Sequence, residues 1–562
     1  MAPSAKTPLL QIRDLSIGFA SVGKLLPAVT TLNLEVYRGE ILALVGESGS
    51  GKSITALSVL QLLPQPPALY TGGAILFGET QPINLLAHPR MEALRGNRIG
   101  MVFQEPMSAL NPVMTCGRQV AEVLVRHKKI SSKQARLEAI SWLGKVQIPG
   151  PEAAYDKYPH QMSGGQKQRV MIAMAICCKP DLLICDEPTT ALDVTVQNEI
   201  LLLLSELQQE SGMGVLFITH DLGVVRQIAH RVAIMYRGKL VETGSTGAVF
   251  NNPQQAYTRA LLACRPSAQQ PGTRLPVVAD FLEKHQVQEV PLQVTKMKAT
   301  GKVLAQVKDL VVRYTIARNI WGKATRQFQA VDGVSFELLQ GETLGLVGES
   351  GCGKTTLGRT LLGLEQPSEG SICINGRDIT RFNKQEWKGF RKAVQLVFQD
   401  PFAALNPRLT IGDALAEPLQ LSGNFLQSQS RAKRVRQLLD LVQLPADAAR
   451  RYPHEFSGGQ RQRIVIARAL ATEPGLLVCD ESVSALDVSV QAQVLNLLND
   501  LKAELGLTLL FISHDLSVVR YISNRIMVMQ AGRIVESGDA ATVFTNPQHA
   551  YTRQLLAAVP KI

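Results

Sequence analysis

The stretch ILALVGESGSGKS, residues 41–53, decides how this chain folds. Its first five residues are apolar without interruption, which is typical of a parallel strand buried on both faces. A glycine-rich turn and then a helical pattern follow, so the stretch predicts a strand, a tight loop and a helix in succession. The apolar runs DLLICDE and VLFITHD also alternate with helical patterns. This alternation predicts an α/β fold that binds ligands beyond the carboxyl ends of its strands.

The same stretch occurs a second time, as TLGLVGESGCGKT at residues 343–355. Five further segments recur in the same order, among them YPHQMSGGQKQR as YPHEFSGGQRQR and NPQQAYTRALLA as NPQHAYTRQLLA. A repeat this long is a duplicated domain rather than a solenoid unit. The predicted first domain spans 1–265 and ends in a C-terminal segment at about 245–265. A proline-containing linker follows at 266–302, with a short helix around 277–286. The predicted second domain spans 303–562, with its C-terminal segment at about 539–562.

Composition narrows the class of protein. With 45% hydrophobic and 19% charged residues, the 562-residue chain is neither disordered nor a disulfide-rich miniprotein. The formal charge of +12 suits nucleic acid, an anionic membrane surface or anionic ligands equally well. The eight cysteines form no CxxC pair, so we expect free thiols in a reducing compartment and neither zinc nor an iron–sulfur cluster. We expect no secretory signal and no membrane span, hence an intracellular protein whose membrane contact is peripheral.

Both repeats contain the G-x-x-x-x-G-K-[ST] pattern of a phosphate-binding loop, after an apolar strand and before a helix. Glycines let backbone N–H groups turn toward phosphates, and the helix N-terminus adds partial positive charge. The lysine reaches the β- and γ-phosphates and the hydroxyl binds Mg²⁺. The candidate residues are Gly46, Ser48, Gly49, Gly51, Lys52 and Ser53 in the first half, and Gly348, Ser350, Gly351, Gly353, Lys354, Thr355 and Thr356 in the second.

Two acidic residues end a strand in each half, at LLICDE and LLVCDE. Asp186 and Asp480 are candidate Mg²⁺ ligands, because hard cations prefer oxygen donors. Glu187 and Glu481 follow directly, where a carboxylate can polarise an attacking water. These parts predict a nucleotide hydrolase.

A second anion site is predicted at MSGGQKQR and FSGGQRQR, where a hydroxyl and bare amides begin a helix. Two such sites suit two domains that face head to tail, each closing on the other's nucleotide. At this point the chain resembles the ABC ATPase family over nearly all of both halves. The residues that carry this resemblance are Ser163, Gly164, Gly165 and Gln166, with Ser457, Gly458, Gly459 and Gln460.

The resemblance implies ATP and Mg²⁺ as ligands and, in each half, a RecA-like α/β core with an antiparallel β part and a helical subdomain near 105–180 or 400–474. It also implies roles for single residues. Gln104 and Gln399 would sense the metal and the attacking water, His220 and His514 would contact the γ-phosphate, and Asp193 and Asp487 would cross between sites. Phe19 and Tyr314 occupy the position of the aromatic that stacks on adenine, although a core aromatic is an equal alternative for Phe19.

Three further features resemble the ATPases of oligopeptide, dipeptide and nickel importers: LNP after the glutamine, YPH before SGGQ, and NPQxAYTRxLLA near each domain end. Fusion in one chain resembles the ATPases of glutathione and microcin importers. The resemblance implies two separate transmembrane permeases, an external substrate-binding protein, and a peripheral place on the cytoplasmic face of the bacterial inner membrane. It implies an internal pseudo-dimer, so that no homodimer is required, and no nucleic-acid partner. Many unfused relatives carry a cysteine-rich segment after the NPQxAYT run, but this chain has only Cys264 there, so we expect no iron–sulfur cluster.

Other functions remain open at this point. The alternatives are a soluble double-ABC ATPase acting on ribosomes or DNA, and the ATPase of an exporter. The linker is short and proline-rich, which disfavours the ribosomal alternative, and long coiled-coil insertions that a DNA-repair ATPase would need are missing. The second half gains seven residues at 315–329, which we interpret as a solvated surface loop. Contact of this insertion with lipid or permease, through Arg318, Trp321, Lys323 and Arg326, is the alternative.

Overall fold

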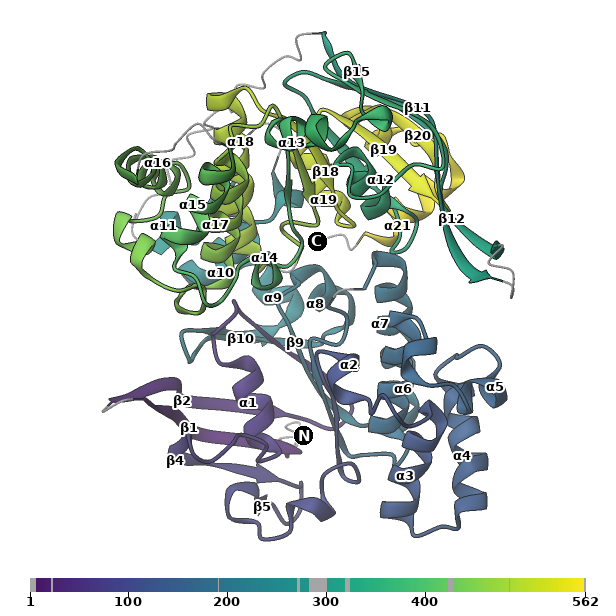
Figure 1. Ribbon diagram of the computed structural model, residues 1–562. Helices are drawn as coiled ribbons and strands as arrows, with labels where there is room; N and C mark the ends of the chain where they lie inside the picture. The colour runs from purple at the N-terminus through teal and green to yellow at the C-terminus, as the bar shows by residue number, and fades with distance from the viewer. Residues whose placement is uncertain are drawn as a thin grey trace. The chain divides into compact units, whose positions relative to one another are not determined.

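The computed structural model describes residues 7–21, 24–190, 192–269, 273–282, 301–318, 324–422, 428–484 and 486–559. The chain divides into two compact units (Figure 1). Described residues up to Leu262 belong to the first unit, and those of Ala263–Asp280 and from 301 to Val559 belong to the second. The boundaries inferred from the sequence stay predictions, and each unit is described by itself.

The first unit is built on a mixed sheet. Among the described residues its strand order is β10-β9-β3-β8-β7-β6, and all neighbours are parallel except β10. The central strands β3, β7 and β8 are buried along their whole length, which confirms that these apolar runs are covered on both faces. The strands are β3 (Ile41–Val45), β6 (Ile99–Val102), β7 (Leu182–Asp186), β8 (Gly214–Thr219), β9 (Arg231–Tyr236) and β10 (Lys239–Ser245).

A smaller antiparallel sheet shares one hydrophobic core with the main sheet. Its strand order is β2-β1-β4-β5, with β1 (Leu10–Ser21), β2 (Lys24–Val36), β4 (Ala68–Phe77) and β5 (Ile83–Asn84). Short 3₁₀ turns, η1 (Leu85–Ala87) and η2 (Met91–Ala93), follow it. This sheet is the expected antiparallel β part of the domain.

The helices fall into three groups. Those that follow strands of the main sheet are α1 (Lys52–Val59), α7 (Val194–Ser211) and α8 (Leu222–Ile228). The predicted helical subdomain comprises α2 (Pro106–Ala109), α3 (Cys116–Lys128), α4 (Ser132–Lys145), α5 (Pro151–Tyr155), η3 (Pro159–Gln161) and α6 (Gly164–Ile176). It packs around its own core, which includes Val120, Leu143 and Val170. The C-terminal segment forms α9 (Thr246–Asn251) and α10 (Ala256–Ala263).

The second unit repeats this plan, which confirms the duplication. Its sheets have the orders β12-β11-β14-β15 and β16-β17-β18-β13-β19-β20. The strands are β11 (Val303–Arg318), β12 (Ala324–Leu339), β13 (Thr343–Val347), β14 (Glu369–Ile374), β15 (Arg377–Asp378), β16 (Val394–Val397), β17 (Leu476–Asp480), β18 (Thr508–Ile512), β19 (Arg525–Gln530) and β20 (Arg533–Asp539). The helices are α12 (Lys354–Leu361), η5 (Ile379–Arg381), α13 (Lys384–Ala393), α14 (Pro401–Ala404), α15 (Ile411–Ser422), α16 (Ser428–Leu441), η6 (Ala446–Arg450), η7 (Pro453–Glu455), α17 (Gly458–Leu470), α18 (Val488–Leu505), α19 (Leu516–Ile522), α20 (Ala540–Thr545) and α21 (Ala550–Ala558).

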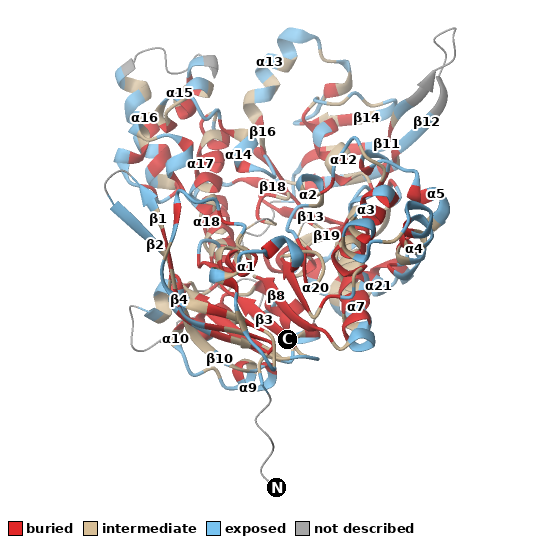
Figure 2. Cartoon of the chain, turned by 90° about the horizontal axis from the view of Figure 1, so that it is seen from below, coloured by how far each residue is buried: buried red, intermediate tan, exposed pale blue. Residues whose placement is uncertain are grey.

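Figure 2 shows buried residues concentrated on the main sheet strands and on the faces of the helices that cover them. Part of the predicted linker, up to Asp280, also belongs to the second unit, as η4 (Pro266–Ala268), an extended stretch and the first residues of α11 (Val278–Leu282). Leu275 of that stretch is fully buried. The rest of the predicted short helix, and the insertion residues Trp321 and Lys323, lie outside the described residues. In the part of the chain that is described, no helix is both long and apolar enough to cross a bilayer.

Candidate nucleotide sites

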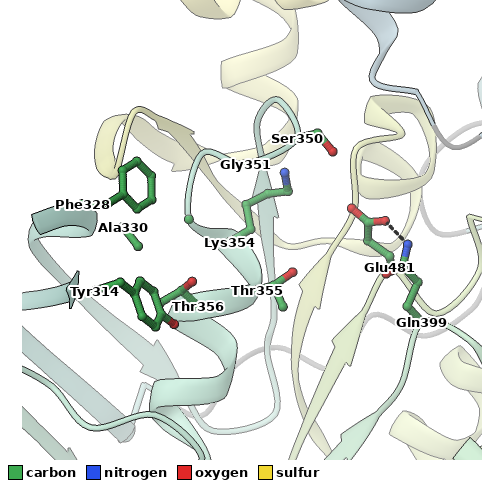
Figure 3. Close-up of a pocket in the computed structure, with 11 residues that line it drawn as sticks. Tyr314, Phe328, Ala330, Ser350, Gly351, Lys354, Thr355, Thr356, Gln399 and Glu481 are labelled. Atoms are coloured by element: carbon green, nitrogen blue, oxygen red, sulfur yellow. Dashed lines mark hydrogen bonds between the residues drawn. The ribbon is translucent and has the colours of Figure 1, made fainter. Parts of the chain in front are cut away.

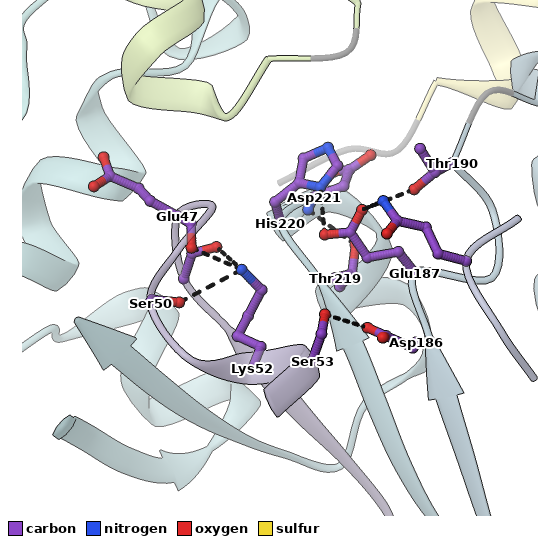
Figure 4. Close-up of polar contacts among 12 residues, drawn as sticks. Glu47, Ser50, Lys52, Ser53, Asp186, Glu187, Thr190, Thr219, His220 and Asp221 are labelled. Atoms are coloured by element: carbon purple, nitrogen blue, oxygen red, sulfur yellow. Dashed lines mark hydrogen bonds and ion pairs between the residues drawn. The ribbon is translucent and has the colours of Figure 1, made fainter. Parts of the chain in front are cut away.

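The first glycine loop joins β3 to α1 and holds its lysine inward. Gly51 begins the helix with a left-handed backbone (φ 100°), which favours glycine. A Cβ atom at Gly46 would lie 2.3 Å from the carbonyl oxygen of Met235 on β9, so this position has no room for a side chain. Lys52 is buried and its Nζ donates to the carbonyl oxygens of Gly46 (2.7 Å) and Glu47 (2.8 Å) (Figure 4).

The hydroxyl of this loop meets the first acidic residue. Ser53 Oγ donates to Asp186 Oδ1 over 3.0 Å, at the point where β7 ends (Figure 4). Burial raises the pKa of Asp186 to about 6, against the hydrogen bond from Ser53. A buried carboxylate beside a hydroxyl is a suitable oxygen donor set for Mg²⁺, which usually completes its shell with phosphate and water.

Glu187 is the centre of a second polar cluster (Figure 4). Its Oε2 accepts hydrogen bonds from Gln104 Nε2 and Thr190 Oγ1, both at 3.0 Å, and its Oε1 lies 3.2 Å from His220 Nδ1. Burial acts to raise the pKa of Glu187, but the hydrogen bond and charge of His220 and the charge of Lys52 outweigh it, so the pKa is lowered. The carboxylate is therefore ionised near neutral pH and can accept a proton.

The backbone of this glutamate is also unusual. Glu187 has φ 46° and Glu481 has φ 48°, both in the left-handed region. Such a conformation costs about 1 kcal/mol or more in a residue with a side chain and recurs at functional sites. The N–H of each glutamate donates to the neighbouring strand, to Ile218 or Ile512, which holds the turn in place.

The second unit assembles the corresponding groups (Figure 3). Lys354 Nζ donates to the carbonyl oxygens of Gly348 and Glu349, both at 2.8 Å, and Thr355 Oγ1 donates to Asp480 at 3.2 Å. The carboxylate of Glu481 accepts from Gln399 Nε2 (2.8 Å) and lies 3.3 Å from His514 Nδ1. Burial acts to lower the pKa of His514, but its hydrogen bond with Glu481 outweighs it and the pKa is raised.

A pocket of about 320 Å³ extends from this second loop toward the antiparallel sheet. Tyr314 lines it, and so does Phe328, which the sequence reasoning missed (Figure 3). These two residues are cross-strand neighbours on β11 and β12. In the first unit the equivalent pair is Phe19 and Leu26, and the Phe19 ring packs partly buried against the core. Stacking of Phe19 on adenine stays a prediction.

The SGGQ runs lie in the helical subdomains. Ser163 and Ser457 are the N-caps of α6 and α17, and each accepts a hydrogen bond from the N–H of Gln166 or Gln460. The second glycine of the run is required by packing, which the sequence did not reveal. A Cβ atom at Gly165 would lie 2.6 Å from the Val196 side chain on α7. The approach of either serine to a phosphate of the other half stays a prediction.

The fold and these two clusters define a pair of P-loop ATPase domains. The model of the ABC transporter family matches residues 29–190 and 331–484, and that of the oligopeptide/dipeptide transporter C-terminal region matches 241–285 and 535–562. The chain belongs to the ABC transporter family.

Two curated relatives agree with this assignment. The chain is 47% identical over 560 residues to the glutathione import ATP-binding protein GsiA of Pectobacterium atrosepticum, covering 98% of this chain and 89% of that protein. It is 48% identical over 558 residues to GsiA of Escherichia coli K12, with the same coverage. A dimeric post-hydrolysis structure of the cassette MJ0796, bound to ADP and Pi, is 27% identical and covers 42% of this chain and 98% of its own, with a TM-score of 0.38. The predicted class, an importer-type ATPase for peptide-like compounds, is confirmed.

Proposed function

We propose that this chain powers the import of glutathione or another short peptide by hydrolysing ATP at two sites. The observation that carries the proposal is the duplicated glutamate cluster. The glutamine-to-glutamate distances are 3.0 and 2.8 Å, and the histidine-to-glutamate distances are 3.2 and 3.3 Å. Since both halves keep the glutamine, the glutamate and the histidine of this cluster, we infer two hydrolytic sites rather than one active and one degenerate site. The names of the GsiA relatives suggest glutathione.

The roles within each site follow from the contacts. Lys52 and Lys354 would exchange their main-chain carbonyl partners for phosphate oxygens. Glu187 and Glu481 would accept the proton of the attacking water, and His220 and His514 would hold those carboxylates in position. Ser53, Asp186 and Gln104, and their counterparts Thr355, Asp480 and Gln399, would hold Mg²⁺. The metal would neutralise charge on the phosphate oxygens when bound.

We further propose that the two halves pair within one chain. Ser457 with Gly458 and Gly459 would complete the first site, and Ser163 with Gly164 and Gly165 would complete the second. Helix N-termini with bare amides favour anions, which supports this arrangement. ATP would then contact both halves, and hydrolysis would remove those contacts and let the halves part.

The chain would act at the cytoplasmic face of the bacterial inner membrane, bound to two permeases that receive cargo from an external binding protein. The test is to tag the full chain, solubilise native membranes gently and identify what co-purifies. Two multi-span permeases and a binding protein that takes up glutathione or dipeptides are the expected result. Ribosomes or DNA without a permease would overturn the transport function. ATP-driven movement of cargo out of the cytoplasm would overturn import.

A further inference from the structure

The C-terminal segment of each half reaches its own phosphate loop through one tyrosine. The N–H of Glu47 lies 3.3 Å from Tyr257 Oη, and the N–H of Glu349 lies 3.1 Å from Tyr551 Oη. In both cases the N–H donates and the phenol oxygen accepts. Both tyrosines are buried, with 2% and 5% of their surface exposed. The same contact occurs in both copies of the duplicated domain, which have otherwise diverged in sequence, and this indicates a built feature rather than a chance approach.

The glutamate whose N–H donates to the tyrosine also accepts a hydrogen bond from the lysine of the phosphate loop. Glu47 presents its N–H to Tyr257 and its carbonyl oxygen to Lys52 Nζ, 2.8 Å away. Glu349 does the same between Tyr551 and Lys354. The phenol therefore restrains the stretch of backbone from which the loop lysine is oriented.

The start of the helix that carries each tyrosine is held by a carboxylate on the last strand of the main sheet. Glu242 on β10 accepts hydrogen bonds from the N–H groups of Gln254 (2.8 Å) and Gln255 (3.1 Å), just before α10 begins. Glu536 on β20 binds Gln548 (2.8 Å) and His549 (3.0 Å) in the same way before α21. The start of each helix is thus fastened, and the tyrosine in its first turn has a defined place.

We propose that Tyr257 and Tyr551 are positioning residues of the nucleotide sites, through which the peptide-transporter C-terminal region holds each phosphate loop ready for ATP. This inference rests on the proposed function. It extends that function to the C-terminal region, which would act on the phosphate loop without touching the nucleotide itself. A loop held in its binding shape before ATP arrives loses less conformational freedom on binding, so affinity is gained without a new contact.

The test is the full chain with both hydroxyls removed, Tyr257→Phe and Tyr551→Phe together, which keeps both rings. We expect the KM for MgATP to rise about two- to ten-fold, the effect of one hydrogen bond per site, with kcat changed less than about two-fold. The unfolding midpoint is measured alongside. The matched control is Tyr236→Phe, because the Tyr236 ring packs on Tyr257 with centroids 4.2 Å apart and its counterpart in the second half is Gln530.

An unchanged KM in the double variant would overturn the inference. If the unfolding midpoint fell while KM stayed the same, the hydroxyls of Tyr257 and Tyr551 would have only a structural role. An equal rise in KM in the Tyr236→Phe control would also overturn the inference, because the effect would then not be specific to these two hydroxyls. Failure of the wild-type chain to hydrolyse ATP would instead overturn the proposed function itself, so the two failures are distinguishable.

Discussion

The docking of residues 273–278 on the second unit makes one prediction that can be worked out in detail. The Asn496 side chain, on α18, donates to the carbonyl oxygen of Leu275 (2.8 Å) and accepts from its N–H (3.0 Å). Tyr521 on α19 donates to the carbonyl oxygen of Thr273 at 2.8 Å. The perturbation is Asn496→Leu, which is the residue found at the equivalent position of α7 in the first half, Leu202.

The substitution would leave two buried main-chain groups of Leu275 without partners, at a cost of about 1–3 kcal/mol each. Detachment of the segment relieves that cost. The burial of the Leu275 side chain is given up on opening in both proteins, so it cancels from the difference between them. We therefore expect the opening of this segment to become easier by at least about 2 kcal/mol, which is a rise of about thirty-fold or more in the open population.

The assay is hydrogen exchange across residues 266–282, with tryptic cleavage after Arg274 as a second readout. The matched control is Asp500→Asn, which breaks the ion pair of Arg274 with Asp500 (3.0 Å). Both partners are about 40% exposed, so this pair contributes about 1 kcal/mol or less. Exchange of the Leu275 amide at the wild-type rate in Asn496→Leu, or a larger effect of Asp500→Asn, would refute this reasoning.

Three shorter predictions concern the sites. Glu187→Gln and Glu481→Gln together should lower ATP turnover by about 10²-fold or more, and each change alone should remove the share of its own site, as measured by phosphate release; a single variant with wild-type turnover would mean that its site is not hydrolytic. Phe328→Ala should weaken nucleotide binding in the second half by about 1 kcal/mol or more, measured by competition with a fluorescent ATP analogue, whereas Leu26→Ala should have little effect. Chelation of divalent cations should abolish turnover and added Mg²⁺ should restore it; full activity in excess chelator would contradict the metal role.

The sequence predicted those parts of the fold and site that follow from local pattern. The G-x-x-x-x-G-K-[ST] spacing between a strand and a helix defines the phosphate-binding loop, so the places of Lys52 and Lys354 could be predicted directly. The carboxyl ends of neighbouring parallel strands meet at one edge, which is why Glu187 and His220, each next to a strand end, come together.

The contacts that were missed depend on tertiary register. Phe328 lies beside Tyr314 only because of how β11 pairs with β12, across a hairpin whose length differs between the halves. The Asn496 contact depends on which side chain of α18 faces the docked segment, and no periodic pattern encodes that choice. The tyrosine of the NPQxAYT run is visible in the sequence, but its partner, Glu47, lies 210 positions away from Tyr257.

The fusion of two cassettes in one polypeptide has a consequence for how they can change over time. In an assembly of two identical chains, every substitution is copied into both ATP sites at once. Here each half is encoded by its own part of one gene, so the second half can have Phe328 where the first half has Leu26. The covalent link also delivers the two halves in equal numbers and at high effective concentration. The two halves can therefore diverge in sequence while they remain joined in one chain.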